Sequence, residues 1–336
     1  MKIAFFELET WEKKYLQERT LPGEVVFIDG PLDETKLPEQ NDFDAISVFV
    51  NSIVGDKVLG HFPNLQLIAT RSTGYDHFDL PTCAARGVKV ANVPSYGEDT
   101  VAEYAFALML TLSRKICESY ERIRETGSFD LTGLRGFDLK GKTLGVIGTG
   151  RIGKNAIEIA RGFNMNIVAY DKFPDPVYAE KMGYRYLSLD EVLATADILT
   201  LHVPYLPENH HLINAETLAK MKSGAYLINT ARGGLIDTAA LLVALKSGQI
   251  AGAGLDVLEE EGVIKDEVNF LTNGRLDQGD LKTVLGNHIL IDLPNVIITP
   301  HNAFNTWEAL KRILDTTVAN LVAFEAGMPQ NLISGD

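Results

Sequence analysis

The sequence contains little cysteine. Only Cys83 and Cys117 occur among its 336 residues, and they form neither a C-x-x-C pair nor a disulfide framework. A chain without such a framework is most simply placed in a reducing compartment, so we expect a cytoplasmic protein. No set of cysteines, histidines and acids has the spacing of a metal-binding motif, and the sequence therefore predicts no metal site.

Positive charge is also scarce. The chain has 31 Lys and Arg residues against 45 Asp and Glu residues, which gives a net charge of −14. This balance disfavours binding to nucleic acid and to anionic membrane surfaces. We therefore expect no nucleic-acid partner, although a local basic site could still bind a small acid.

Long hydrophobic runs are missing as well. The longest apolar stretch, around Tyr104 to Leu112, is shorter than the ~20 residues that a membrane-spanning helix needs. Glu7 and Glu9 come too early for the apolar core of a signal peptide. The sequence therefore predicts no membrane partner.

The chain does have enough apolar residues, 46%, and enough length for two hydrophobic cores, so two domains are expected. Its first part alternates short apolar runs with polar segments of helical character, which predicts a small α/β unit with a parallel sheet. The runs are Ile3 to Phe6, Val25 to Ile28, Ala45 to Val50, Leu67 to Thr70 and Val88 to Asn92. A long helix follows, and its apolar face from Val101 to Ile116 is expected to be core or a subunit contact.

A glycine-rich stretch, L-G-V-I-G-T-G-R-I-G, ends a short β-branched run at Val146 and Ile147. Gly148, Gly150 and Gly153 then occupy the G-x-G-x-x-G positions as a helical pattern opens. These glycines permit a tight strand-to-helix turn, let the backbone approach a pyrophosphate, and let the helix pack close to the strand. The helix start also forms an anion site.

Asp171 completes this unit, because it follows the predicted helix Ile152 to Phe163 and the predicted strand Ile167 to Tyr170. An acidic side chain at that strand end can accept hydrogen bonds from a ribose 2′-hydroxyl, and it would repel a 2′-phosphate. The sequence therefore predicts a dinucleotide site that prefers NAD to NADP.

Strand and helix patterns continue to alternate after Asp171, which predicts a doubly wound parallel sheet with helices on both faces. The predicted strands are Ile198 to Val203, Tyr226 to Thr230, Ala253 to Val257 and Val296 to Thr299. The predicted helices are Leu187 to Ala196, Asn214 to Met221 and Thr238 to Ser247. In contrast, the segment Gly262 to Asp292 is predicted to be loop-like, because Asn273-Gly274, Gln278-Gly279 and Gly286-Asn287 resemble turns.

Unusual polar groups follow three of the predicted strands. Arg232 follows one strand, Glu259, Glu260 and Glu261 follow the next, and His301 ends the last. The carboxyl ends of parallel strands lie along one edge of a sheet, where ligands bind, so a cation, an acid and a histidine can converge there. Taken singly, each could instead be a surface ion-pair partner, a solvated acidic run or a loop histidine.

The motifs G-T-G-R-I-G, L-H-V-P-Y, I-N-T-A-R-G, G-L-D-V and I-T-P-H together resemble those of the D-isomer-specific 2-hydroxyacid dehydrogenase family. Within that family, R-S-T-G-Y-D-H-F-D-L, the E-E-E-G segment and H-N-A-F-N-T are most similar to D-lactate dehydrogenases. The resemblance implies a Rossmann-type doubly wound domain inserted into a smaller, flavodoxin-like α/β substrate domain. It places the substrate domain at 1–99 plus 304–336 and the NAD-binding domain at 100–303.

The resemblance also implies roles for individual residues. It assigns catalysis to Arg232, Glu261 and His301, where Glu261 is chosen over Glu259 and Glu260 by its spacing from Asp256. It implies substrate contacts at Thr73, Gly74, Tyr96, Arg232, His301 and Phe304. It implies NAD contacts at Gly148, Gly150, Arg151, Ile152, Gly153, Asp171, His202, Val203, Pro204, Asn209, Thr230, Ala231, Arg232 and Asp256. Family members are commonly homodimers.

The implied reaction is reversible hydride transfer between NADH and the C2 carbonyl of a small 2-oxo acid. Protonated His301 would deliver a proton to the carbonyl oxygen, Arg232 would hold the carboxylate, and Glu261 would orient the imidazolium. Pyruvate is the leading substrate, bulkier 2-oxo acids come second, as in a D-2-hydroxyisocaproate-type dehydrogenase, and phosphite oxidation is a distant third. A non-enzymatic NAD-sensing binding protein is the alternative from another class.

Overall fold

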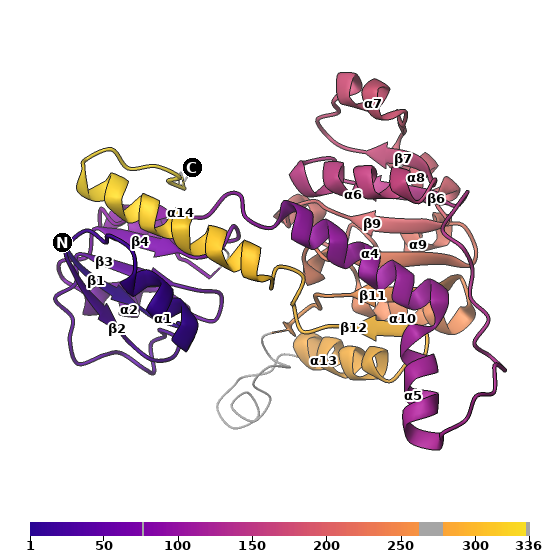
Figure 1. Ribbon diagram of the computed structural model, residues 1–336, viewed down its shortest axis with the longest axis horizontal. Coiled ribbons are helices and arrows are strands. Elements are labelled where there is room, and N and C mark those ends of the chain that lie inside the picture. The colour runs from indigo at the N-terminus through magenta and orange to yellow at the C-terminus, as the bar shows by residue number, and fades with distance from the viewer. Residues whose placement is uncertain (76, 262–277, 334–336) are drawn as a thin grey trace. The chain divides into compact units, whose positions relative to one another are not determined.

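The computed structural model describes residues 1–75, 77–261 and 278–333 (Figure 1). The chain divides into two compact units, one formed by Met1–Tyr96 with Asn305–Asp336 and the other by Gly97–Phe304. In the part of the chain that is described, no helix is both long and apolar enough to cross a membrane.

The first unit is built on a five-stranded parallel sheet with the strand order β2-β1-β3-β4-β5. Its strands are β1 (Lys2–Phe5), β2 (Glu24–Phe27), β3 (Ala45–Val48), β4 (Leu67–Thr70) and β5 (Lys89–Ala91). This is the order of a flavodoxin-like sheet. Ile3 and Phe5 of β1 are buried in one core and Ala4 in another, as expected for a strand covered on both faces.

Helices cover both faces of this sheet. The core that contains Ile3 is completed by Leu16 of α1 (Thr10–Gln17) and Leu314 of α14 (Trp307–Glu325). The opposite core includes residues of α2 (Asp56–His61) and α3 (Leu80–Ala85). The C-terminal helix therefore belongs to the same unit as the N-terminal strands, as Figure 1 also shows.

A buried arginine lies at the carboxyl edge of the first sheet. Arg71, only 1% exposed, follows β4 and donates from Nη2 to the carbonyl oxygens of Phe6 and Glu7, at 2.7 and 2.8 Å. Burial lowers the pKa of its guanidinium to about 10, opposed by the charges of Glu12 and Glu7, so Arg71 stays charged at neutral pH. These contacts fix the start of the loop that carries Thr73.

The second unit contains a seven-stranded parallel sheet with the order β12-β11-β10-β9-β6-β7-β8. Its strands are β6 (Thr143–Ile147), β7 (Asn166–Tyr170), β8 (Arg185–Tyr186), β9 (Ile198–Leu201), β10 (Ala225–Asn229), β11 (Ile250–Leu255) and β12 (Val296–Ile298). The chain starts in the middle at β6, runs outward to β8, and then crosses to β9 and beyond. This is Rossmann topology, so the predicted fold class is confirmed.

Two helical layers enclose the second sheet, each over its own hydrophobic core. One core contains residues of α4 (Glu98–Arg114), α6 (Arg151–Gly162) and α7 (Pro176–Met182). The other contains residues of α8 (Leu189–Thr195), α9 (Ala215–Lys220), α10 (Thr238–Ser247) and α13 (Gln278–Ile291). The carboxyl ends of the strands remain between these layers and carry the polar groups predicted from the sequence.

Two predicted elements differ from the structure. The long helix α4 ends at Arg114, because Lys115 adopts a left-handed conformation with φ of 55°, and Ile116 begins α5 (Ile116–Thr126). Ile116 is 53% exposed and is therefore not part of the core, so of the two alternatives predicted for this face, core or subunit contact, only the second stays a prediction for Ile116. The left-handed residue breaks the periodicity by redirecting the chain.

The loop-like prediction for Gly262 to Asp292 is wrong in its second half, where α13 runs over Gln278–Ile291. Residues 262–277 lie outside the described residues. Gly286 reflects close packing instead of a turn, because a Cβ at this position would lie 2.9 Å from Thr238 Cγ2 of α10. Its neighbour Asn287 is fully buried and donates from Nδ2 to the Glu259 carbonyl at 2.7 Å.

Candidate active site

The glycine turn between β6 and α6 has little room for side chains. Gly148 has φ of 91°, and a Cβ there would lie 2.6 Å from the carbonyl oxygen of His202. A Cβ on Gly153 would lie 2.0 Å from the carbonyl oxygen of Gly148. In contrast, a Cβ on Gly150 would meet no atom within 4 Å, so the backbone at the start of α6 faces open space. This open backbone, beside the unsatisfied N–H groups of a helix start, is a cradle suited to a phosphate.

Asp171 lies beside this turn in a fixed orientation. Its Oδ2 accepts hydrogen bonds from the backbone N–H and the hydroxyl of Thr149, at 2.6 and 3.0 Å. Its Oδ1 accepts from the Phe173 N–H at 2.8 Å. Asp171 follows β7, the strand that pairs with β6. The carboxylate and the glycine turn are therefore held together, as a cofactor ribose next to a pyrophosphate requires. Thr149, the second residue of the motif, was not singled out from the sequence.

The loop after β9 contains four of the predicted cofactor residues. His202 is half-buried, and its Nε2 lies 3.0 Å from Thr200 Oγ1. Burial lowers the pKa of His202 to about 4, so its ring is neutral at physiological pH. Asn209 uses its side chain to brace this loop, because Nδ2 donates to the Pro204 carbonyl and Oδ1 accepts from the Leu206 N–H, each at 2.7 Å. Val203, which is half-buried, and Pro204, which is exposed, complete the loop.

The end of β10 carries Thr230, Ala231 and Arg232. Thr230 is 8% exposed, and its Oγ1 has no hydrogen-bond partner within the described parts of the chain. Asn229 shapes this turn, since its Oδ1 accepts from the Ala231 N–H and its Nδ2 donates to the Arg232 carbonyl. The Arg232 guanidinium donates from Nη1 to the Ala231 carbonyl at 2.8 Å. A buried hydroxyl without a hydrogen-bond partner suits a site where a bound ligand supplies that partner.

Asp256 connects the end of β11 to the loop after β12. Its carboxylate is 1% exposed and accepts from the Thr299 hydroxyl at 2.5 Å and from the N–H groups of Asn302 and Ala303, both at 2.8 Å. Its own carbonyl accepts from the His301 N–H at 2.8 Å. Burial raises the pKa of this carboxyl, and the three donors oppose the increase. The contacts of Asp256 therefore hold the loop that carries His301.

His301 is paired with Glu261. His301 Nδ1 lies 2.7 Å from Glu261 Oε1, and both side chains are about one-third exposed, at 30% and 31%. Of the three neighbouring glutamates, Glu259 instead contacts His211, and Glu260 adopts φ of 50°. The Phe304 ring lies edge-on to His301, with centroids 6.5 Å apart. The carboxylate on Nδ1 orients the ring and leaves Nε2 as the nitrogen for proton exchange.

In the first unit, the loop after β4 is held by side-chain hydroxyls. Thr73 Oγ1 donates to the Val93 carbonyl at 2.7 Å, and Ser72 Oγ donates to the Gly74 carbonyl at 2.6 Å. The N–H groups of Thr73 and Gly74 have no acceptor among the residues that the structure describes. Two such N–H groups can receive a carboxylate. Tyr96, which is half-buried, is the last residue of this segment of the unit.

The comparisons with known proteins agree with this geometry. Residues 106–303 match the family model described as D-isomer specific 2-hydroxyacid dehydrogenase, NAD binding domain. The D-lactate dehydrogenase of Escherichia coli K12 is 37% identical over 97% of this chain and 98% of its own length. An aromatic 2-oxoacid reductase of Clostridium sporogenes is 41% identical over 84% of this chain and 83% of its own length.

A solved structure extends the likeness to three dimensions. The D-lactate dehydrogenase of Aquifex aeolicus, complexed with NAD and lactic acid, superposes with a TM-score of 0.84 at 34% identity and 99% coverage of both chains. The family match, the glycine turn with Asp171, and the paired His301 and Glu261 at the strand ends all point the same way. The chain thus belongs to the D-isomer-specific 2-hydroxyacid dehydrogenases, which are NAD-dependent oxidoreductases of small 2-hydroxy acids.

Proposed function

We propose that this protein is an NAD-dependent D-lactate dehydrogenase that interconverts pyruvate and D-lactate. The observation that carries the proposal is the hydrogen bond between His301 Nδ1 and Glu261 Oε1 at the carboxyl edge of the Rossmann sheet. A pair of this kind prepares an imidazole for exchanging a proton with a substrate hydroxyl or carbonyl oxygen. The names of the D-lactate dehydrogenases of E. coli and A. aeolicus support the choice of substrate.

His301 is proposed as the acid and base. When bound, NAD supplies the hydride acceptor, and NADH the hydride donor, for C2 of the substrate. In the reducing direction, His301 donates the proton on Nε2 to the carbonyl oxygen of the 2-oxo acid, and in the oxidising direction it removes that proton from the hydroxyl. Glu261 keeps the ring oriented through Nδ1 in both directions.

Arg232 and the loop after β4 are proposed to bind the substrate. The Arg232 guanidinium provides charge-assisted hydrogen bonds to the substrate carboxylate and polarises the carbonyl. The N–H groups of Thr73 and Gly74 provide further donors to the same carboxylate. Tyr96 and Phe304 are proposed to border the substrate, where their rings would limit the size of its side chain.

The remaining predicted residues are proposed to hold NAD. Gly148, Gly150, Gly153, Arg151 and Ile152 form the turn and helix start for the pyrophosphate. The Asp171 carboxylate accepts hydrogen bonds from the ribose hydroxyls, and its negative charge repels the 2′-phosphate of NADP. The loop after β9 and the ends of β10 and β11 supply the other contacts, through His202, Val203, Pro204, Asn209, Thr230, Ala231 and Asp256.

Bulkier 2-oxo acids are the second candidate substrates, because the C. sporogenes relative is named an aromatic 2-oxoacid reductase. NADH consumption with pyruvate, phenylpyruvate and a branched 2-oxo acid, with the chirality of the product determined, distinguishes the two. We expect the highest kcat/KM for pyruvate and a D-configured product. A higher kcat/KM for phenylpyruvate would assign the second function, and negligible turnover with every acid would contradict both.

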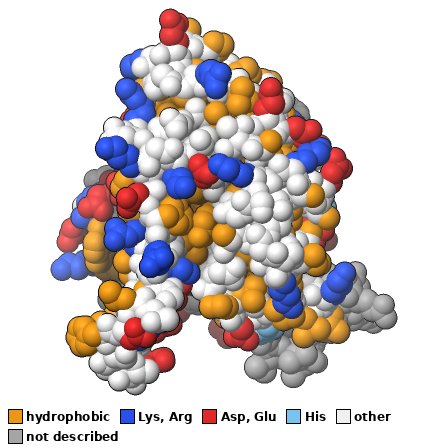
Figure 2. All heavy atoms as spheres, turned by 90° about the vertical axis from the view of Figure 1, so that its right-hand side faces the viewer, with side chains coloured by type: hydrophobic (Ala, Val, Ile, Leu, Met, Phe, Trp, Pro, Cys, Tyr) orange, Lys and Arg blue, Asp and Glu red, His pale blue; other side chains and the backbone are white. Residues whose placement is uncertain are grey.

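We also propose that the protein forms a homodimer. Several large apolar side chains on and after α5 are exposed, including Tyr120 at 62%, Phe129 at 82% and Leu131 at 79%. Figure 2 shows one face of the molecule, on which hydrophobic side chains form several exposed groups among charged ones. Exposed apolar residues gathered in one short segment are typical of a subunit contact.

A further inference from the structure

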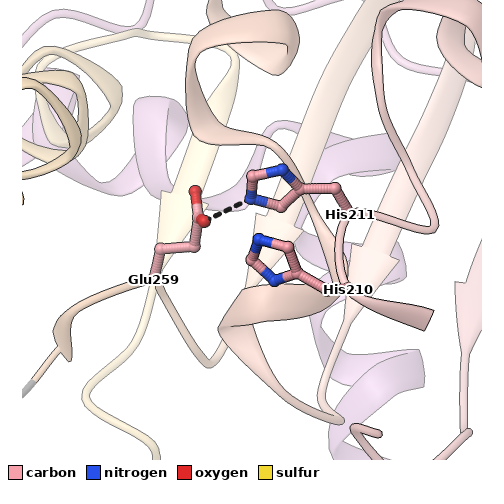
Figure 3. Close-up of side chains that lie close together, drawn as sticks. All are labelled: His210, His211 and Glu259. Carbon is pink, nitrogen blue, oxygen red and sulfur yellow. Dashed lines mark hydrogen bonds and ion pairs between the residues drawn. The ribbon is translucent and has the colours of Figure 1, made fainter. Parts of the chain in front are cut away.

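Two adjacent histidines and a glutamate that have no role in the proposed reaction lie close together. His210 and His211 follow the short turn η1 (Pro207–Asn209), and Glu259 follows β11. One ligand atom from each of the three side chains lies within 4.8 Å of the others. Figure 3 shows the two rings side by side, with the Glu259 carboxylate directed at His211. We refer to His210, His211 and Glu259 as the His-His-Glu cluster.

The backbone explains why neighbouring histidines face the same way. In an extended chain, successive side chains point to opposite sides. His211, however, has φ of 52°, in the left-handed region that residues with a Cβ seldom adopt, and its N–H donates to the Gly234 carbonyl at 2.9 Å. The two rings consequently stack, with centroids 3.7 Å apart and an angle of 26° between their planes. Both imidazoles are thereby presented to one region.

Glu259 is held in place by three groups from other segments. Its Oε2 accepts from the Thr238 N–H at 3.0 Å, its carbonyl accepts from Asn287 Nδ2 at 2.7 Å, and its Oε1 lies 2.6 Å from His211 Nε2. On the other side, the Tyr205 hydroxyl lies 3.2 Å from His210 Nδ1, which directs Nε2 of that ring away from the tyrosine. Hydrogen bonds of this kind orient the ligands of metal ions.

We propose that the His-His-Glu cluster binds a divalent transition-metal cation of the zinc class. Two imidazole nitrogens and one carboxylate oxygen suit Zn²⁺, whereas Mg²⁺ prefers oxygen ligands. Three protein ligands leave one position of a tetrahedral ion for water. Binding replaces the hydrogen bond between His211 and Glu259 by one bond from each side chain to the cation, and the proton on His211 Nε2 moves to Nδ1 of the same ring so that Nε2 can act as a ligand. His210 is exposed, so its side chain can move to complete the site.

A purely structural role makes a different prediction. The hydrogen bond between His211 and Glu259 could serve only to tie the loop after β9 to the end of β11, with His210 as a neighbour of no consequence. Glu259→Gln is expected to destabilise the protein in either case, because Glu259 bonds two other segments. His210→Ala separates the two roles, since it removes one proposed ligand and leaves that hydrogen bond intact.

The experiment uses the full-length, metal-free protein and measures Zn²⁺ binding by competition with a chromogenic chelator, with Mg²⁺ as a second probe. We expect one Zn²⁺ per chain, no competition by Mg²⁺, and a loss of Zn²⁺ affinity of at least about tenfold in His210→Ala. The matched control is His61→Gln, which changes a histidine that bonds the Pro38 carbonyl at 2.7 Å, and it should keep the affinity of the parent protein.

Thermal unfolding provides a second readout. Because a bound cation would join two segments of the folded state, Zn²⁺ is expected to raise the Tm of the parent protein and of His61→Gln, but not that of His210→Ala. Without Zn²⁺, His210→Ala should unfold at the same temperature as the parent, because the side chain is exposed. Equal Zn²⁺ affinity in His210→Ala and the parent, or no stoichiometric binding by the parent, would overturn the proposal, whichever 2-oxo acid the enzyme reduces.

Discussion

His301 is positioned by the backbone around it as well as by its own side chain. Its φ of 53° lies in the left-handed region, and its N–H is shared between the carbonyls of Asp256 and Thr299. The Asp256 carboxylate fixes the next two residues through their N–H groups. The imidazole is then oriented by Glu261, so the proposed proton-exchanging group depends on two carboxylates with separate tasks.

Substitutions in the pair test these tasks. His301→Ala is expected to lower kcat by about 10²–10⁴-fold, because it removes the group that exchanges the substrate proton. Affinity for NADH, measured by fluorescence titration, should change little. Glu261→Gln is expected to keep more activity than His301→Ala, because the amide oxygen can still accept a hydrogen bond from Nδ1 of the ring. Near-normal kcat in His301→Ala would assign proton transfer to another residue.

The buried ring of His202 makes the free energy of unfolding depend on pH. Burial keeps its pKa at about 4, whereas an unfolded histidine has a pKa of about 6.5, so the unfolded chain binds more protons between these values. The neutral ring's contribution to stability is therefore complete above about pH 6.5 and lost as the pH falls toward 4, by at most about 3 kcal/mol.

Urea unfolding of the nucleotide-free protein between pH 4 and 7 measures this loss. His202→Gln, which keeps a polar group near Thr200 but cannot titrate, should lose less stability over the same range. Parallel pH profiles for the two proteins would show that His202 is not the group responsible.

At the scale of elements, local pattern predicted most of the fold and part of the site. β4 and α10 begin and end at the predicted residues, because each contains a single apolar run, Leu67 to Ala69 and Ala239 to Leu245, that polar residues bound on both sides. The glycine turn could be predicted because its glycines are local requirements of one strand and one helix. The contact between His211 and Glu259 could not, since the two residues are 48 positions apart and meet only once β9, β10 and β11 are aligned.

The helix α13 was missed for a similar reason. Its glycine and asparagine are suited to a turn when considered locally, yet Gly286 lets α13 approach α10, and Asn287 is buried against the Glu259 backbone. Local sequence preferences give no indication of a neighbouring helix. The turn-like residue pairs therefore predicted a loop at a place where packing against a neighbouring helix stabilises a helix instead.

Substitution of Gly286 tests this explanation. Gly286→Ala places a Cβ about 2.9 Å from Thr238 Cγ2 and is expected to lower the free energy of unfolding by about 1–3 kcal/mol, even though alanine favours helices. Gly162→Ala is the matched control, because a Cβ on this last residue of α6 would meet nothing within 4 Å. It should stabilise the protein by up to about 1 kcal/mol. Equal effects of the two substitutions in urea unfolding would contradict the packing argument.

At the scale of the whole molecule, the chain combines a flavodoxin-like sheet and a Rossmann sheet, and both termini belong to the first. Cofactor binding is thus concentrated in one continuous segment, while the other unit is assembled from the two ends of the chain. The apolar segment on and after α5 belongs to the continuous segment, Gly97–Phe304.

Light scattering after size exclusion tests the dimer. We expect a mass of twice 36.9 kDa for the parent protein and a mass near that of a monomer when Phe129 and Leu131 are both changed to Asp. Two buried carboxylates would oppose association at an apolar contact. The control is Val177→Asp, which changes an apolar residue of α7 that is 79% exposed, and it should leave the mass unchanged. A monomeric parent protein would refute the dimer.

The attachment of the His301 loop to Asp256 has a consequence for evolution and for engineering. Two of the three groups that the Asp256 carboxylate accepts from are peptide N–H groups, which are identical whatever amino acids occupy those positions. Phe304 comes directly after this anchored stretch. Its ring can therefore be exchanged for a smaller or larger one while the anchor of the His301 loop is preserved, so under the proposed roles the preference among 2-oxo acids can change while proton exchange at His301 is retained.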